Sequence, residues 1–240
     1  MPYSWLHAAM LASIALLSTV AIAARRQARH PGAARSLECA VAALYLGMSI
    51  GTFVWLRTQP EFDAATDRPL QLCHWTAVVA ALALVAPQRA FSALAYFWGL
   101  ALCTQAVLTP SLTEGPGTWP FWFFWATHAM CIGVPLYDVL ARGFRPAWRD
   151  YRVACAGAAL YVAIVLPVDV STGWNYGFVG PSRPGFPTIV DVLGPWPLRL
   201  VPIAAIAAAA MALLMLPWRR LRAPPALTRT RERSPPARRA

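Results

Sequence analysis

Residues 4–24 read SWLHAAMLASIALLSTVAIAA, a run of 21 residues without Asp, Glu, Lys or Arg. At about 1.5 Å per residue, a helix of this length reaches roughly 30 Å, the thickness of a bilayer's hydrocarbon core. Of the 240 residues, 58% are hydrophobic and only 13% are charged, about half the charged share of a soluble domain. This composition excludes a disordered protein, a soluble nucleic-acid module and an ordinary cytosolic enzyme. It predicts a polytopic membrane protein.

Further apolar runs follow, and together they predict an all-α membrane helix bundle with seven transmembrane helices. The expected spans are residues 4–24, 37–56, 70–86, 90–109, 119–141, 153–172 and 196–216. Pro135, Pro167 and Pro202 fall inside spans, where each is expected to kink its helix. Gly47 and Gly51 form a GxxxG pair, which is typical of close helix packing. The membrane domain is expected to cover residues 1–217, and the Arg/Pro-rich residues 218–240 to form a disordered tail.

The arginines predict how the bundle is oriented. The net charge is +11, and all 21 basic residues are Arg. With seven alternating spans, 17 arginines fall on the side of the C-terminus and 4 on the other. Basic residues collect in cytoplasmic loops, so the N-terminus is expected outside and the C-terminus in the cytoplasm. This bias accounts for the positive charge, so we expect no nucleic acid as a partner. The tail is either a topology signal alone or a contact for anionic lipid headgroups.

The first span and the cysteines each allow a second interpretation. Residues 21–23 (AIA) resemble a signal-peptidase site, but the run is long and no basic residue precedes it, so we expect a retained helix. Five cysteines are present, without a CxxC motif, at positions Cys39, Cys73, Cys103, Cys131 and Cys155. This number and spacing indicate neither a disulfide framework nor a zinc site. We therefore expect no metal and no cofactor.

Polar side chains within the spans are the strongest functional signal, because polar groups in hydrocarbon are costly. Four spans supply such residues in the outer half of the bilayer: His7, Cys73, His74, Thr104, Gln105, Thr127 and His128. Asp138 lies instead near the cytoplasmic end of its span, where we expect it to pair with a nearby Arg. The convergence predicts a polar pocket that opens to the outer leaflet.

Cys73 and His128 are the candidates for catalysis. A thiolate can attack an acyl carbonyl while an imidazole takes up the proton. On a helix His74 points about 100° away from Cys73, so His128 from another span is the better base. Gln105 or Thr104 can donate to an oxyanion. The alternatives stay open: an inert cysteine, a packing histidine or a weakly indicated metal site. The aromatic residues 119–125 (WPFWFFW) either line a substrate groove or form an interfacial belt.

Taken in order, these motifs resemble the YwaF-type family of bacterial integral membrane proteins. The residues that carry the resemblance are 70–74 (LQLCH), 95–100 (AYFWGL), 104–110 (TQAVLTP), His128, 175–176 (NY) and 191–197 (DVLGPWP). The resemblance extends from His7 to about Pro217. The family is in turn similar to a eukaryotic transmembrane acyltransferase of ether phospholipids, which is related to membrane hydrolases of lipid esters.

The resemblance implies a lipid acyltransferase or lipid-ester hydrolase in a bacterial inner membrane, with Cys73 as nucleophile and His128 as base. Membrane lipids are the implied partners. The expected substrate-binding residues are His74, Thr104, Gln105, Asn175 and Tyr176, the last two at a headgroup. Many bacterial members read His-Leu-Cys-Asp where this chain has QLCH at 71–74. Roles of the absent His and Asp are therefore not carried over.

Two other functions remain open at this stage. A small-molecule transporter or binding protein can use the same pocket without catalysis. It needs a polar route through the cytoplasmic half, where the predicted spans carry few polar residues. An accessory subunit, binding a partner through its tail or its long outer loop, is the third possibility, but the sequence predicts no particular protein partner.

Overall fold

A computed structural model describes residues 4–28, 30–86, 88–110, 112, 114–182, 185 and 188–220. Over these residues the chain is all-helical and contains no β-strand. The main helices are α1 (Trp5–Gln27), α2 (Pro31–Leu56), α3 (Leu72–Val85), α4 (Arg89–Phe97), α5 (Thr104–Leu108), α6 (Trp119–Leu140), α7 (Trp148–Thr172), α8 (Leu200–Leu213) and α9 (Leu216–Arg220). Three short helices of other types complete them: the π-helix η1 (Trp98–Cys103) and the 3-10 helices η2 (Tyr176–Phe178) and η3 (Ile189–Leu193).

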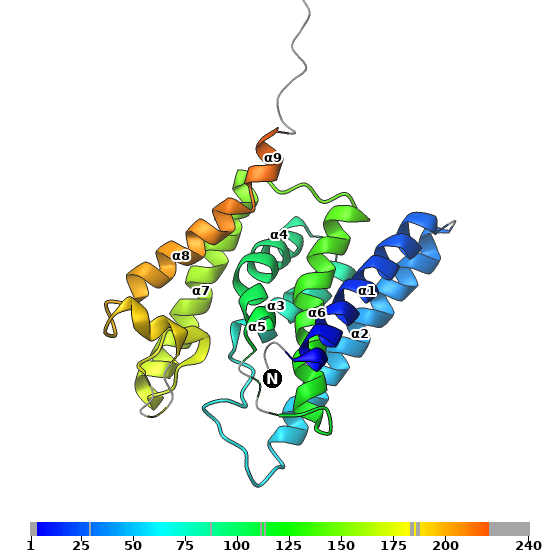
Figure 1. Cartoon of the computed structure of the whole chain (residues 1–240). Coiled ribbons are helices and arrows are strands. Elements are labelled where there is room, and N and C mark those ends of the chain that lie inside the picture. Colours follow the sequence, from blue (N-terminus) through cyan, green and yellow to red (C-terminus); the bar gives the residue numbers. More distant parts are fainter. Residues whose placement is uncertain are drawn as a thin grey trace, which may run out of the picture.

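The helices form a bundle with a central layer and two flanks (Figure 1). The centre consists of α3, α6 and the continuous helix formed by α4, η1 and α5. On one flank α1 packs on α6, and α2 packs on α3; on the other, α7 packs on α4, and α8 packs on η1. Half of the apolar window of Arg89–Leu108 and of Trp119–Leu140 is buried, against about a tenth for α1 and for Leu200–Trp218. The flanking helices therefore present the apolar surface that a bilayer covers.

Six helices in the described part of the chain are long and apolar enough to cross a membrane. They are Trp5–Gln27, Gly32–Leu56, Arg89–Leu108, Trp119–Leu140, Trp148–Thr172 and Leu200–Trp218. The remaining predicted span corresponds to α3, which has only 14 residues and a length of about 21 Å. The chain is thus a multi-pass membrane protein.

Helix boundaries differ from the predicted spans where local capping extends or trims them. Helix α2 begins at Pro31 rather than Leu37, because proline suits the first helical position. Helix α7 begins at Trp148 rather than Val153, where Asp150 Oδ2 accepts a hydrogen bond from the Ala147 N–H at 2.6 Å. The prediction of a kink at Pro202 is wrong. This residue is third in α8, where its missing N–H has no intrahelical partner to lose.

A close crossing in the middle of the bundle joins η1 to α6. Pro135 lacks an N–H, so the carbonyl of Cys131, four residues earlier, is left without its helical donor. Gly99 packs against that carbonyl so closely that a Cβ at this position would lie 2.0 Å from the oxygen. The expected packing role of Gly47 and Gly51 is not seen within the chain. A Cβ at either position would have no neighbouring atom within 4 Å.

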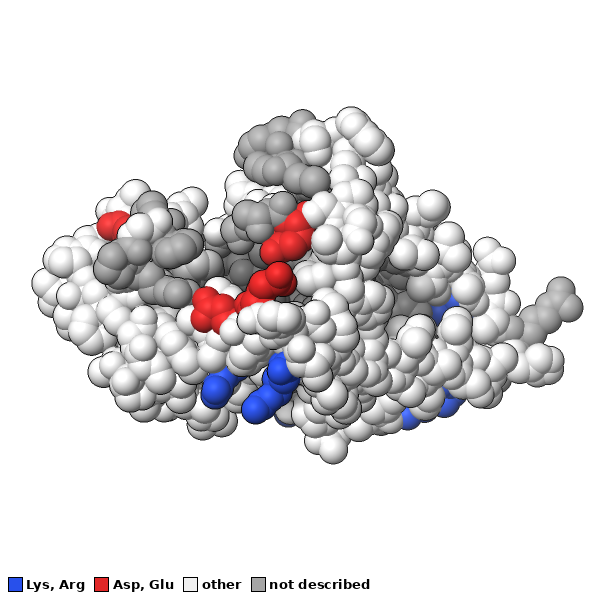
Figure 2. Space-filling model, turned by 90° about the horizontal axis from the view of Figure 1, so that it is seen from below, with Lys and Arg blue, Asp and Glu red and all other residues white. Residues whose placement is uncertain are grey.

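The two ends of the bundle differ in charge. The connections α1–α2, α3–α4 and α6–α7, together with α9, lie at one end, here called the upper end from Figure 1. The connections α2–α3, α5–α6 and α7–α8 lie at the opposite, lower end. Figure 2 shows acidic side chains gathered on the lower face, and the α2–α3 connection there carries the exposed Glu61 and Asp63. The upper end instead carries most of the described arginines.

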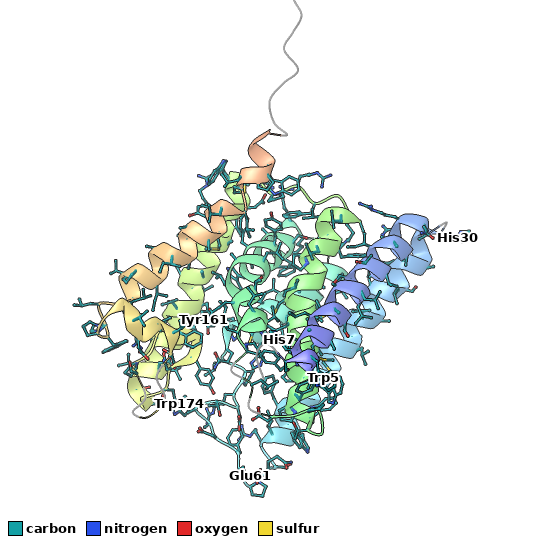
Figure 3. All side chains as sticks on the ribbon, viewed as in Figure 1. Trp5, His7, His30, Glu61, Tyr161 and Trp174 are labelled. Carbon is teal, nitrogen blue, oxygen red and sulfur yellow. The ribbon has the colours of Figure 1, made fainter. Side chains whose placement is uncertain are left out.

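Helix α3 extends between these two ends. Tyr161 donates a hydrogen bond from its hydroxyl to the carbonyl of Leu70 at 2.7 Å, just before α3, in the lower half (Figure 3). Arg35 donates to the carbonyls of Leu84 and Val85 at the upper end. A guanidinium there also stabilises the negative end of the helix dipole. The short helix therefore has both of its ends fixed by neighbouring helices.

Candidate functional site

His128 is the most unusual polar side chain in the lower half of the bundle. It lies on α6 and is 2% exposed. Its Nδ1 lies 2.8 Å from the carbonyl oxygen of Phe124. A carbonyl can only accept, so Nδ1 carries the proton and Nε2 holds a lone pair. That Nε2 is buried and has no hydrogen-bond partner among the described residues. The local helical bond thus fixes the tautomer that leaves a basic nitrogen available.

His74, on α3, lies within electrostatic range of His128 on α6. The His74 ring packs edge-on against Phe53 at 5.1 Å and tilted against Phe123 at 5.7 Å. Its Nδ1 is also buried without a partner in the described part of the chain. Each imidazole therefore has an unsatisfied nitrogen and an aromatic neighbour on α6, Phe123 for His74 and Phe124 for His128.

Cys73 occupies the first turn of α3 and is half-buried. The thiol of Cys131 donates to the Cys73 carbonyl at 3.3 Å. Cys103, whose thiol donates to Thr76 Oγ1 at 3.5 Å, lies within electrostatic reach of Cys73. All five cysteines are free thiols. Within the described ranges, no group of three His, Cys, Asp or Glu side chains is arranged to hold a metal ion.

The other predicted substrate-binding residues make different contacts. Thr104 donates its hydroxyl to the Leu100 carbonyl at 2.9 Å, within its own helix. Gln105 is exposed on α5. Asn175 Oδ1 accepts from the Gly180 N–H at 3.0 Å and so holds the turn after α7. In the structure as it stands, these three side chains do not join the histidine pair.

Tyr176 is a fully buried anchor for the lower loops. Its hydroxyl accepts from the Arg68 N–H at 3.1 Å and donates to the Ala64 carbonyl at 2.8 Å. Burial raises the pKa of this phenol to about 12, so it stays neutral and can make both bonds. Tyr176 therefore ties the segment after α7 to the α2–α3 connection. The lower loops are thereby ordered, and the hydroxyl uses its donor and an acceptor position in doing so.

The remaining polar residues that were expected to converge do lie in the lower half. His7 (Figure 3) donates from Nε2 to the carbonyl of Val107 at 2.7 Å, near the end of α5. Thr127 receives a long hydrogen bond from the Tyr45 hydroxyl at 3.4 Å. Both side chains are buried. They differ from His128 because their known partners are internal groups of the bundle.

Asp169 was missed by the sequence analysis. It is 0% exposed and lies in the last turn of α7. Oδ1 accepts from the Tyr176 N–H at 3.0 Å, while Oδ2 is buried without a described partner. Tyr161 lies within electrostatic reach of both Asp169 and Cys73. A carboxylate within an apolar run of residues 153–172 is itself a signal of function and was available from the sequence.

At the upper end, buried carboxylates are paired. Asp138 forms an ion pair with Arg142 at 2.8 Å, which confirms the expected local pairing. Asp150 pairs with Arg89 at 2.7 Å. Glu38, also missed as a buried group, accepts from the Tyr137 hydroxyl at 2.6 Å and lies 3.5–3.9 Å from three arginines: Arg25, Arg35 and Arg142. The upper half therefore contains more buried polar residues than the sequence analysis expected.

Comparison with known proteins identifies the family. A sequence profile of the TMEM164 family matches residues 2–215, nearly the whole chain. No curated protein and no solved structure is significantly similar to the chain. The profile includes every predicted site residue, and it describes a transmembrane family, in agreement with the six apolar helices. This multi-pass membrane protein belongs to the TMEM164 family.

Proposed function

We propose that the protein transfers or hydrolyses acyl groups of membrane lipids, with Cys73 as the nucleophile and His128 as the base. The observation that carries this proposal is the state of His128. Its tautomer directs a lone pair on Nε2 into a buried site where nothing in the described chain uses it. Leaving a buried polar atom unsatisfied costs about 1–3 kcal/mol. A cost of that size favours a functional role over simple packing.

The chemistry balances with these two residues. His128 Nε2 takes the thiol proton of Cys73 as Sγ attacks the ester carbonyl. The ester C–O bond breaks, and the imidazolium returns the proton to the leaving lipid alcohol. An acceptor alcohol, or water, then gives its proton to His128 and attacks the thioester. The C–S bond breaks, and Cys73 regains its proton. The resemblance to an ether-phospholipid acyltransferase favours an acceptor alcohol over water.

His74, Thr104, Gln105, Asn175 and Tyr176 are proposed as the substrate-binding surroundings of this pair. His74 is the best supported, because its Nδ1 is unsatisfied and the ring lies within electrostatic range of His128. Thr104, Gln105 and Asn175 are proposed to contact the substrate after a change of side-chain rotamer. Tyr176 acts by ordering the lower loops.

We further propose seven crossings, with the N-terminus outside and the C-terminus in the cytoplasm of a bacterial inner membrane. Two features support α3 as the seventh crossing: its ends are fixed at opposite ends of the bundle, and arginines gather at the end that carries α9. Reporter fusions at the two termini test this. Opposite locations of the N- and C-terminal reporters support seven crossings, and equal locations exclude them.

The catalytic proposal is tested by acylation with a long-chain p-nitrophenyl ester that carries an alkyne. The purified wild type is expected to be acylated at Cys73. Cys73→Ala should abolish this labelling, and His128→Gln should slow it at least 100-fold. Matched controls are Cys155→Ala, a half-buried thiol on α7, and His7→Gln, whose ring nitrogen already has a partner. Labelling that is equal across the cysteines, or insensitive to His128, contradicts the proposal.

A further inference from the structure

A groove lies between the start of α7 and the end of α8, away from the His128 region. It has a volume of about 350 Å³ and is lined by Trp148, Ala209, Ala212, Leu213 and Leu216. This volume is within the range of small-ligand sites, about 300–1,000 Å³. None of its lining residues belongs to the His128 region, so this groove and the candidate catalytic pair are separate features of the fold.

The walls of the groove are apolar and fixed in place. Tyr151 donates its hydroxyl to the Ala208 carbonyl at 3.3 Å and so joins α7 to α8. Trp148 packs edge-on against Tyr151 at 5.5 Å. Beyond the groove, the Trp218 indole N–H donates to the Tyr96 hydroxyl at 2.9 Å and holds α9 against α4. The small side chains of Ala209 and Ala212 on α8 line the groove together with the bulky Trp148.

Positive charge borders this groove at the upper end. Arg152 is exposed on α7 four residues after Trp148, so it lies on the same side of the helix as the indole. The exposed Arg149, three residues before Arg152, lies beside it on the helix surface. Arg149 is 69% exposed, and its nearest carboxylate oxygen, on Asp150, is 3.9 Å away. Arg145, stacked 5.2 Å over the Trp218 ring, lies at the same end. Arg145 Nη1 already donates to the carbonyls of Val139 and Phe144, so Arg149 and Arg152 are the guanidinium groups available to an external anion.

We propose that this groove binds one anionic phospholipid, with an acyl chain along α8 and the phosphate at Arg149 and Arg152. Two observations select this occupant: the apolar groove between α7 and α8, and the exposed guanidinium groups of Arg149 and Arg152 beside it. Arginine binds phosphate in a bidentate manner, and each basic residue near a membrane surface gives about a fivefold preference for anionic lipid. The site is independent of the proposed catalysis.

The test uses the full-length protein in detergent and native mass spectrometry with matched-chain phosphatidylglycerol and phosphatidylcholine. We expect phosphatidylglycerol to bind at least tenfold more tightly. The double variant Arg149→Gln/Arg152→Gln should remove this preference. Ala212→Phe should fill the groove and weaken both lipids at least tenfold. A chain-free glycerol phosphate should not compete, because the acyl chain supplies much of the affinity.

Two matched controls separate the groove from general charge. Arg229→Gln/Arg231→Gln removes the same charge from the C-terminal segment, and Arg57→Gln changes an exposed arginine near the lower end. Both should bind phosphatidylglycerol like the wild type. Loss of binding in the C-terminal variant, or normal binding in both Ala212→Phe and a second variant, Trp148→Ala, overturns the proposal. Equal binding of the two lipids in every variant also overturns it, since it indicates adventitious lipid only.

Discussion

The upper and lower halves of the bundle differ in whether certain buried polar groups have partners. In the upper half, the carboxylates of Asp138 and Asp150 are matched by arginines at hydrogen-bond distance. In the lower half, buried atoms of His74, His128 and Asp169 lack partners within the described residues. Both halves have the same apolar surroundings, so the cost of an unpaired polar atom is similar in each.

This difference separates stability from function. The paired groups of the upper half join α2, α4, α6 and the end of α3, so their removal is expected to loosen the fold. The unsatisfied atoms of the lower half are expected to contribute little to stability. Aromatic neighbours hold the His74 and His128 rings, and the Tyr176 N–H holds Asp169. A site that must receive a substrate has to keep such groups available. Four substitutions test this contrast.

The largest effect is expected for Arg142→Ala. Arg142 pairs with Asp138, donates to the Ala83 carbonyl at 2.8 Å and lies near Glu38. Its loss leaves the buried Asp138 carboxylate without its ion-pair partner, which costs about 3–5 kcal/mol. Thermal melting and SDS-induced unfolding of the purified protein measure this. The control Arg57→Ala, an exposed arginine, should change stability by no more than about 0.5 kcal/mol. Equal losses for the two variants would remove the special status of the upper half.

The next largest effect is expected for a substitution at Gly99, in the middle of the bundle where the two halves meet. Gly99→Ala places a Cβ 2.0 Å from the Cys131 carbonyl oxygen, so η1 and α6 must separate. We expect a loss of about 1–3 kcal/mol in the same unfolding measurements. Gly47→Ala on α2 is the matched control, because its Cβ would meet nothing within 4 Å. It should be neutral or stabilise by up to about 1 kcal/mol. A Gly99→Ala protein as stable as wild type would rule out the close crossing.

A local effect is expected for the ion pair between Asp191 and Arg199, which lies in the lower half and holds the loop between α7 and α8. Hydrogen bonds from Ser182 and Thr188, together with Arg199, lower the pKa of Asp191 to about 2. A lowered folded-state pKa means that the stabilisation is complete above the ordinary value of 3.8 and is lost as the pH falls through about 2. Hydrogen exchange of residues 188–199, corrected for intrinsic rates, should stay slow from pH 7 to pH 4. Arg199→Gln should speed exchange at all these pH values; loss of protection in the wild type near pH 5 would contradict the assignment.

The smallest effect on stability is expected for His128→Phe. Phenylalanine preserves the ring contact with Phe124, whose centroid lies 4.2 Å away, and removes the unsatisfied Nε2. Stability should change by less than about 1.5 kcal/mol, or rise, while acylation is lost. Thermal melting and the ester probe measure the two properties on one sample. A destabilisation as large as that of Arg142→Ala would mean that His128 is a structural residue.

Much of this architecture was predictable because hydrophobic run length alone locates long helices. The helix Arg89–Leu108 departs by one residue at each end from the predicted 90–109. Glu38 was missed as a buried group because it is the second residue of the predicted span 37–56, where a charge normally meets water. The contacts of Tyr176 could not be predicted. Its hydroxyl bonds residues 108 and 112 positions away, and such pairings depend on how the loops fold together.

For the candidate site, the sequence supplied the residue types but not their environment. Residue spacing placed His128 in the first half of the predicted span 119–141, and the structure adds its tautomer, its burial and its electrostatic contact with His74. Gln105 and Thr104 were chosen because polar groups stand out in an apolar run. A hydroxyl in a helix can instead bond its own backbone, as Thr104 does. Sequence alone does not distinguish these two cases.

The central claim is that the lower half holds a reactive thiol and a free base, and intact mass measurement tests it most directly. The purified protein is incubated with a phospholipid that carries a deuterated acyl chain, quenched in acid and weighed. We predict a single hydroxylamine-sensitive acyl addition at Cys73 in the wild type and in His7→Gln. The addition should be absent in Cys73→Ala and strongly reduced in His128→Gln. An unmodified wild type, or acylation that persists without Cys73, would contradict the account.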